Sequence, residues 1–158
     1  MNNKAVITKF YHSFSEGNTK GMNECYHKDI SFQDPAFGQL KGERAMKMWE
    51  MLLSNKNQHL KITFNGIEAT NNKGKANWIA EYNFGAKKRK VINKVSAEFE
   101  FKDGKIFEHK DSFDLWKWSK QAMGPVGYII GWTPFMKSKI QSTTNKRLDE
   151  FLAKTTRL

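Results

Sequence analysis

The sequence predicts an α+β fold in which a curved antiparallel sheet packs against three N-terminal helices and carries a C-terminal helical extension. Three observations support this. Apolar residues recur at helical spacing early in the chain, alternate at every second position through residues 59–113, and return to helical spacing beyond residue 115. Helices that precede a run of hairpin-connected strands pack on one face of the sheet, because each element has one apolar side to bury.

The first third of the chain is predicted to hold three helices and one short strand. Gly17 ends the first helix, and proline after Asp34 forces that residue out of the helical region. The predicted elements are a helix over residues 3–16, a short helix that begins at Asn18 or Thr19 and carries Met22, Cys25 and Tyr26, a strand over Ile30–Gln33, a loop over Pro35–Gly42, and a helix over Glu43–Leu53.

Four longer strands follow, joined by hairpin-length turns. The alternation shifts phase at Asn65-Gly66, which predicts a bulge in the first of them. The predicted strands run over His59–Thr70, Lys75–Phe84, Val91–Phe101 and Lys105–Phe113. Residues 1–116 are therefore predicted to form the α+β body.

Residues 117–158 are predicted to form a helical extension packed on the same domain. A helix is expected over Leu115–Met123, and breaks are expected at residues 124–127 and 131–134, where glycine and proline cluster. Helical spacing resumes from Phe135 to Leu152. The apolar run Val126–Ile130 is expected to be a loop, because it is far too short to span a membrane.

Composition narrows the classes of function. The chain has 158 residues, enough for one domain with a substantial core, and its single cysteine allows no internal disulfide. No signal peptide is recognisable, so a cytoplasmic location is expected, without a membrane partner. The net charge of +11 raises nucleic acid as a partner, but only four of the 27 basic residues are arginine and lysines occur in every segment. A solvated lysine-rich surface is therefore expected in place of nucleic-acid binding, and the same holds for the basic run at residues 87–90.

The last predicted strand combines apolar and acidic character on one face. Alternation places Phe107, His109, Asp111 and Phe113 together on that face. A carboxylate on a core-facing side is costly unless it is paired, hydrogen-bonded or lining a cavity. The strand is therefore expected either to close a structural polar network or to line a pocket.

The element order, the segment Phe32–Gly38 with its Asp34-Pro35 pair, and the closing strand resemble the nuclear transport factor 2-like superfamily. This superfamily includes ketosteroid isomerase, limonene epoxide hydrolase and the SnoaL-type polyketide cyclases, and the extension resembles that of a SnoaL-like branch. The resemblance covers roughly residues 3–116. It implies a cone-shaped fold with a pocket between the concave sheet face and the helices, and homodimers through the outer face.

Compared with the ketosteroid isomerases, the chain keeps the base and lacks the oxyanion donors. Asp34 follows Gly17 by seventeen residues, as the catalytic aspartate of those enzymes follows its glycine. Their tyrosine position is Phe10 here, with Tyr11 one place off, and their second donor falls near Ala97. Oxyanion stabilisation is usually the largest catalytic term, so steroid isomerisation by that mechanism is not expected.

The other two enzyme classes point to Asp111. In limonene epoxide hydrolases an Asp-Arg-Asp relay activates water, and the resemblance places one of its aspartates at Asp111. The strand that should supply the arginine and the second aspartate has Ala80 and Tyr82, so epoxide hydrolysis is not expected either. SnoaL-type cyclases use one strand-borne aspartate equivalent to Asp111 as general acid and base.

The chain is thus expected to bind a hydrophobic small molecule and to act on it, if at all, as an isomerase, cyclase or hydrolase. The expected catalytic residues are Asp111, Asp34 and His109, and the expected lining residues are Trp78, Tyr82, Asn93, Phe113 and Trp49. Structural alternatives stay open for each acid: Asp34 can cap a turn before Pro35, and Asp111 can bond to His109. No metal or other cofactor is expected, and the second hypothesis is a non-catalytic binding or dimeric module.

Overall fold

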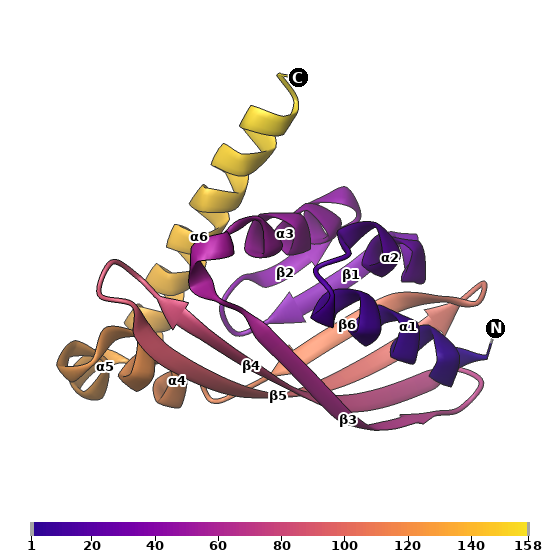
Figure 1. The fold of residues 1–158 in the computed structure, drawn as a ribbon, viewed down its shortest axis with the longest axis horizontal. Helices are drawn as coiled ribbons and strands as arrows, with labels where there is room; N and C mark the ends of the chain where they lie inside the picture. Colours follow the sequence, from indigo (N-terminus) through magenta and orange to yellow (C-terminus); the bar gives the residue numbers. More distant parts are fainter. Residues whose placement is uncertain (1, 158) are drawn as a thin grey trace.

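The computed structural model describes residues 2–157 and confirms the α+β fold. One curved, unclosed six-stranded sheet has the order β2-β1-β6-β5-β4-β3, and three helices cover its concave face (Figure 1). The helices are α1 (Asn3–Ser15), α2 (Thr19–Cys25), α3 (Glu43–Ser54), α4 (Leu115–Met123), α5 (Pro125–Ile130) and α6 (Pro134–Thr155), with a 3₁₀ turn over Lys56–Gln58. The strands are β1 (Tyr26–Asp34), β2 (Gly38–Lys41), β3 (Lys61–Ala69), β4 (Lys73–Phe84), β5 (Arg89–Lys102) and β6 (Lys105–Ser112).

Local sequence signals explain most helix boundaries. The Asn18 side chain accepts a hydrogen bond from the Gly21 N–H and caps α2. Of the two predicted first residues, Asn18 and Thr19, it is therefore Asn18 that caps the helix. Asp114 caps α4 in the same way through the Lys117 N–H, and Thr133 caps α6, whose first residue is Pro134. Each cap satisfies a backbone donor that the helix itself leaves free.

The predicted hairpin run from β3 to β6 is confirmed, including the irregularity in β3. The register between β3 and β4 shifts between Asn65 and Glu68, where Gly66 adopts a φ of 64°. Glycine suits this bulge because it lacks the Cβ that makes positive φ values costly.

The edge of the sheet at β1 and β2 differs from the prediction. The loop predicted over Pro35–Gly42 contains β2, which pairs antiparallel with β1, and β1 itself begins at Tyr26 in place of Ile30. β1 also pairs with β6 in parallel, so the sheet is mixed and not wholly antiparallel. The β1–β6 pairing joins segments about 80 residues apart. Both pairings supply the backbone partners that short, weakly alternating segments need.

A second irregularity corrects the predicted inward face of β6. The register between β5 and β6 shifts between Glu100 and Phe101, which turns Ile106 into the core and leaves Phe107 partly exposed. The prediction that Phe107 faces inward is therefore wrong, because one extra residue in a strand reverses the alternation on that side of it. His109 and Asp111, beyond the bulge, are buried as expected.

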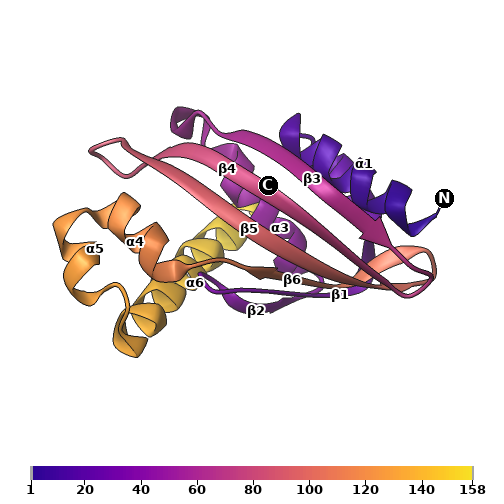
Figure 2. The same cartoon turned by 90° about the horizontal axis from the view of Figure 1, so that it is seen from below.

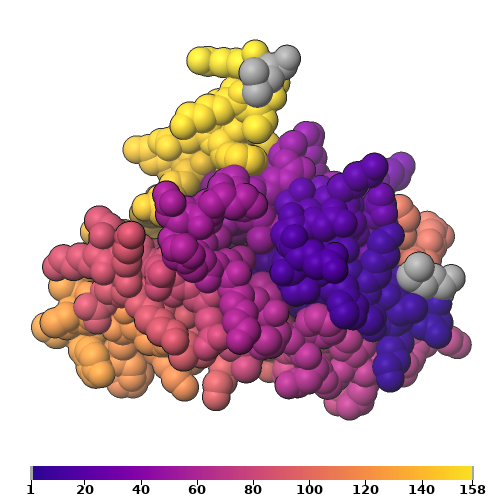
Figure 3. Space-filling model, in the orientation of Figure 1, coloured from indigo at the N-terminus to yellow at the C-terminus, as the bar shows by residue number. Residues whose placement is uncertain are grey.

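The extension consists of three helices at one end of the sheet. α4 and α5 project beyond the end of the sheet beside the β4–β5 hairpin (Figure 2), and the run Val126–Ile130, expected as a loop, lies within the short helix α5. α6 contacts α3 near its middle, where Arg44 bonds to Asn145 and Asp149, and its C-terminal part stands away from the body (Figure 3). Within residues 2–157, no helix combines the length and the apolar character needed to cross a bilayer.

Candidate functional site

The inward face of β6 places two ionisable side chains in the centre of the molecule. His109 is 1% exposed and Asp111 is 3% exposed. The His109 Nε2 atom lies 2.9 Å from the Asp111 Oδ1 atom, so the two side chains are bonded to each other along one strand. The structural alternative predicted for Asp111, a bond to His109, is therefore present.

The Asp111 carboxylate determines the direction of the hydrogen bonds along this chain of side chains. A carboxylate oxygen can only accept, so the His109 Nε2 atom carries a hydrogen and donates it to Asp111. In the neutral ring the Nδ1 atom then accepts from the Tyr26 hydroxyl, whose oxygen lies 2.7 Å away. The Trp49 Nε1–H in turn donates to the Tyr26 hydroxyl oxygen over 2.9 Å.

Asp111 is the final acceptor in this series of hydrogen bonds. Its Oδ1 atom also accepts from the Trp78 Nε1–H over 3.2 Å. One carboxylate oxygen thus receives two hydrogen bonds, from an imidazole and an indole, and both of its lone pairs are used. Within the aromatic interior these bonds offset part of the cost of burying the charge.

Aromatic rings fill the space on the helix side of this network. The His109 ring stacks on Trp49 at a centroid distance of 6.1 Å. It also meets Phe10, Phe32 and Phe99 at centroid distances between 4.6 and 5.5 Å. A ligand can therefore reach Asp111 only if some of these rings move. The hydrogen-bond network is therefore sealed inside the cone, as a packed core is.

Tyr11, which lies one place from the tyrosine position of the ketosteroid isomerases, adds a hydroxyl group to this interior. Its hydroxyl is fully buried and forms no hydrogen bond with any side chain or backbone group of residues 2–157. Burial raises its pKa well above the ordinary value, and the charge of Asp111 raises it further, so the hydroxyl lies within the field of that carboxylate. An unpaired buried hydroxyl is costly, and it is available to hydrogen-bond a ligand.

Asp34 lies at the end of β1, in the turn that leads to β2. Its Oδ1 atom accepts a hydrogen bond from the Phe37 N–H over 2.6 Å, so the predicted capping role before Pro35 is present. Its pKa is nevertheless raised from 3.8 to about 7. Burial is the largest cause and the charge of Asp111 adds to it, while the hydrogen bond from Phe37 acts in the opposite direction. The two acids are therefore close enough to influence each other across the cone.

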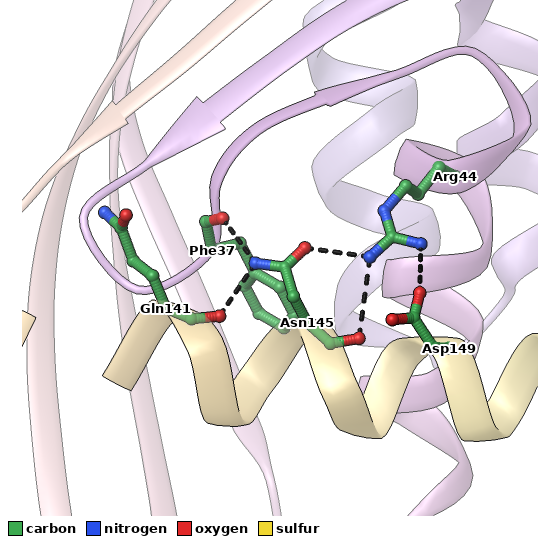
Figure 4. A network of polar contacts seen from close by, with 5 residues as sticks. All are labelled: Phe37, Arg44, Gln141, Asn145 and Asp149. Carbon is green, nitrogen blue, oxygen red and sulfur yellow. Dashed lines mark hydrogen bonds and ion pairs between the residues drawn. The ribbon is translucent and has the colours of Figure 1, made fainter. Parts of the chain in front are cut away.

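Helix α6 holds the turn that carries Asp34. Three side chains from successive turns of α6 donate to three consecutive carbonyl oxygens of that turn. The pairs are Gln141 with Pro35 at 3.1 Å, Thr144 with Ala36 at 2.8 Å, and Asn145 with Phe37 at 2.8 Å. Arg44 of α3 donates to the Asn145 Oδ1 atom and to Asp149, which ties α6 to α3 (Figure 4). These donors face one way because residues three and four apart share one side of a helix.

Replacing Asn145 by alanine is expected to lower the free energy of unfolding by about 1–2 kcal/mol, because the Phe37 carbonyl and Arg44 both lose a partner. Urea denaturation followed by circular dichroism measures the change. Ser142→Ala, on an exposed side of the same helix, is the matched control and should change the free energy by less than about 0.5 kcal/mol. Equal losses in both variants would show that the contact to the turn is not what stabilises α6.

A second polar pair lies at the open end of the cone. The Trp118 Nε1–H of α4 donates to the Tyr82 hydroxyl oxygen over 2.7 Å, which leaves the Tyr82 hydrogen free to donate. Burial raises the pKa of Tyr82, and the charge of Asp34 adds to this effect, so the two groups lie within electrostatic reach of each other. Trp116 and Trp132, the other tryptophans of the extension, are exposed.

The predicted site residues thus fall into two groups. Trp49, Trp78, His109 and Asp111 form one buried network, and Asp34 and Tyr82 lie together nearer the solvent. Asn93 and Phe113 are partly exposed, and Phe113 packs on the core. Tyr26 was missed as a member of the network, since the sequence assigns it to a helix; Trp118 and the α6 donors were missed because only the tertiary structure brings them there.

Two surface depressions lie away from these groups. One, of about 450 Å³, opens on the outer face of the sheet and is lined by charged side chains of β3, β4, β5 and β6, including Glu68, Lys75 and Glu98. The other runs along the exposed side of α1. Residues 2–157 hold no cluster of three His, Cys, Asp or Glu side chains placed to bind a metal ion.

Comparison with protein families matches residues 7–109 to the model of the SnoaL-like domain. The chain belongs to the SnoaL-like domain family. The match covers α1 to most of β6 and thus includes Asp34 and His109, while Asp111 and the helical extension of this SnoaL-like protein lie beyond it. No curated protein matches the sequence.

Solved structures share the fold of this SnoaL-like protein at low sequence identity. An LEH-like epoxide hydrolase of M. tuberculosis is 16% identical with a TM-score of 0.63, over 80% of this chain and 93% of that one. A hypothetical protein of Catenulispora acidiphila with a ketosteroid isomerase-like fold, solved with trimethylamine, is 12% identical with a TM-score of 0.66, over 85% and 100%. TerC, co-crystallised with polyporic acid, is 13% identical with a TM-score of 0.65, over 75% and 96%.

Proposed function

We propose that this SnoaL-like protein binds a hydrophobic small molecule at the open end of its cone and exchanges a proton with it through Asp34. The observation that supports the proposal is the pKa of Asp34, which burial and the charge of Asp111 raise to about 7. A carboxyl with a pKa near neutrality can both accept a proton and return it.

The neighbouring groups suit a ligand that is largely apolar and carries one oxygen. Tyr82 has a free hydroxyl hydrogen, Asn93 brings an amide to the same end of the cone, and Phe113 supplies an apolar surface. Asp111 lies deeper, and its charge adds to the effect of burial in keeping the affinity of Asp34 for its proton high. Two structural relatives bind small organic molecules, polyporic acid and trimethylamine, within the same fold.

The reaction that fits these groups is proton transfer at a carbon next to a carbonyl group. Asp34 as carboxylate removes the proton from carbon, a hydroxyl such as that of Tyr82 hydrogen-bonds to the carbonyl oxygen as negative charge develops there, and Asp34 returns the proton. Isomerisation, aldol-type cyclisation and related eliminations all begin with this step. Asp111 lies behind it and accepts from His109.

Exchange of hydrogen for deuterium in 1-tetralone, followed by NMR in heavy water, tests the proposal without knowledge of the natural ligand. The wild-type protein is expected to accelerate exchange at the carbon next to the carbonyl, and Asp34→Asn to reduce the protein-dependent rate about 100-fold. Asp29→Asn, an exposed aspartate on the same strand, should leave the rate unchanged. Equal rates for wild type and Asp34→Asn would remove Asp34 as the base.

The second candidate is a non-catalytic binding module of the same fold. It is favoured by the capping bond of Asp34 and by the burial of Asp111 among aromatic rings. The same ketone distinguishes the two: amide chemical shifts of Tyr82 and Asn93 that move without any accelerated exchange indicate binding alone.

Three finer predictions accompany this function. We propose that the protein is cytoplasmic, that it forms a homodimer through the outer sheet face, and that residues 117–158 belong to the same folding unit as residues 1–116. Leu148 of α6 is fully buried in the shared core, which supports the last of these. Sedimentation equilibrium measures the oligomeric state.

A further inference from the structure

The exposed apolar side chains gather at one end of the molecule. Among residues 2–157, seven large hydrophobic residues are exposed by 36% or more, and six of them lie between α4 and the first turn of α6. We call these six residues the apolar tip: Trp116, Val126, Tyr128, Ile129, Trp132 and Phe135. Ile92, the seventh, is held against α4 by bonds from its backbone to Gln121. Contiguous exposed apolar surface of this kind marks an interaction site.

Positive charge surrounds the apolar tip. The basic hairpin at residues 87–90 lies beside it, since the Arg89 Nε–H donates to the Gln121 carbonyl at the end of α4 over 2.9 Å. Residues 85–90 and 115–140 together contain eight basic residues and no acidic one, whereas the rest of the chain has nineteen basic and sixteen acidic residues. Most of the net charge of +11 is therefore carried at this end, although lysines also occur in the other segments.

The side chains of the tip are those that favour the boundary between lipid and water. Tryptophan and tyrosine prefer the headgroup level, and the aliphatic and phenyl groups of Val126, Ile129 and Phe135 prefer the acyl region. The Lys120 ammonium lies 4.0 Å from the Trp116 ring centroid and 5.4 Å from that of Tyr128, so a cation sits directly among the aromatic rings. A lysine rim of this kind matches the negative potential of anionic headgroups.

We propose that the apolar tip docks this protein on the surface of a membrane that contains anionic lipids, with the basic hairpin against the headgroups. Surface docking needs no spanning segment, so it is compatible with the absence of a membrane-spanning helix in residues 2–157. The aliphatic residues favour lipid over nucleic acid, since nucleic-acid surfaces offer bases to stack and phosphates to pair but no acyl region. The proposal does not depend on proton transfer at Asp34.

Co-sedimentation with vesicles tests the proposal on the full chain. Binding to phosphatidylcholine vesicles with 30% phosphatidylglycerol is expected to be at least about tenfold stronger than binding to phosphatidylcholine alone, and to weaken with added salt. Ile129→Ser combined with Phe135→Ser should reduce binding by about tenfold or more, and Lys87→Gln combined with Lys88→Gln by roughly tenfold. The matched controls are Phe151→Ser, at the far end of α6, and Lys28→Gln combined with Lys41→Gln, two exposed lysines elsewhere.

Three results would overturn the proposal. One is the absence of vesicle binding at low salt by a wild-type protein with a cooperative thermal transition. Another is a tip variant that binds vesicles as tightly as the wild type. The third is a concentration-dependent dimer that the Ile129 and Phe135 variant abolishes while vesicle binding is absent, since the tip would then be a contact between two copies.

Discussion

Replacing Asp111 by alanine is expected to lower the free energy of unfolding by about 3–4 kcal/mol. The substitution leaves the Trp78 indole N–H and the His109 Nε2–H without an acceptor in the centre of the core. Each buried donor left without a partner costs about 1–3 kcal/mol. Chemical denaturation of the variant, with the slope against denaturant compared with wild type, measures the loss.

The variant Asp111→Asn distinguishes the contribution of the hydrogen bonds from that of the negative charge, because it removes only the charge. Its amide oxygen can occupy the position of Oδ1 and accept from both donors, so the expected loss is about 1 kcal/mol. Ser112→Ala, the exposed neighbour on β6, should be close to neutral. Equal losses for the alanine and asparagine variants would show that the hydrogen-bond network does not stabilise the core.

Replacing Asp34 by asparagine is expected to stabilise the protein at pH 8 and to have little effect at pH 4. The pKa of Asp34 rises from 3.8 to about 7 on folding, so the native state holds its proton more tightly than the unfolded state. The contribution of Asp34 to the free energy of unfolding is therefore most favourable below pH 4. It becomes less favourable as the pH rises from 4 to 7 and stays constant above pH 7. Asparagine cannot ionise, and its oxygen can still accept from the Phe37 N–H.

The expected gain at pH 8 is on the order of 2–4 kcal/mol, with allowance for the partial exposure of Asp34 to solvent. Thermal unfolding of both proteins at half-unit steps from pH 4 to pH 8 measures the difference curve, which should change most between pH 4 and 7. Asp29→Asn, exposed on the same strand, should give a flat difference curve. A flat curve for Asp34→Asn would contradict the raised pKa and weaken the proposed role in proton transfer.

Local signals in the sequence predict the helices and the long hairpins well. Asn18 caps α2, the bulge at Gly66 interrupts β3, and proline and glycine mark the boundaries of α4 and α6. These features depend on residues within a few positions of each other, so the sequence alone contains their causes.

Pairing between distant segments is not encoded in this local way. β1 extends back to Tyr26 because it lies parallel to β6, which is about 80 residues further along the chain. The bulge that turns Phe107 outward likewise arises where β5 and β6 shift register. Such features appear only when the backbone hydrogen bonds of both partners are known.

The candidate site shows the same division. The sequence by itself determined the family fold, the inward face that carries His109 and Asp111, and the pairing of Asp34 with a proline turn, since each follows from alternation or from a short motif. The tertiary structure alone decided that Tyr26 joins Trp49 to His109 and that α6 holds the Asp34 turn. Burial and the charge of a second acid raise the pKa of Asp34, and both depend on which side chains folding brings together.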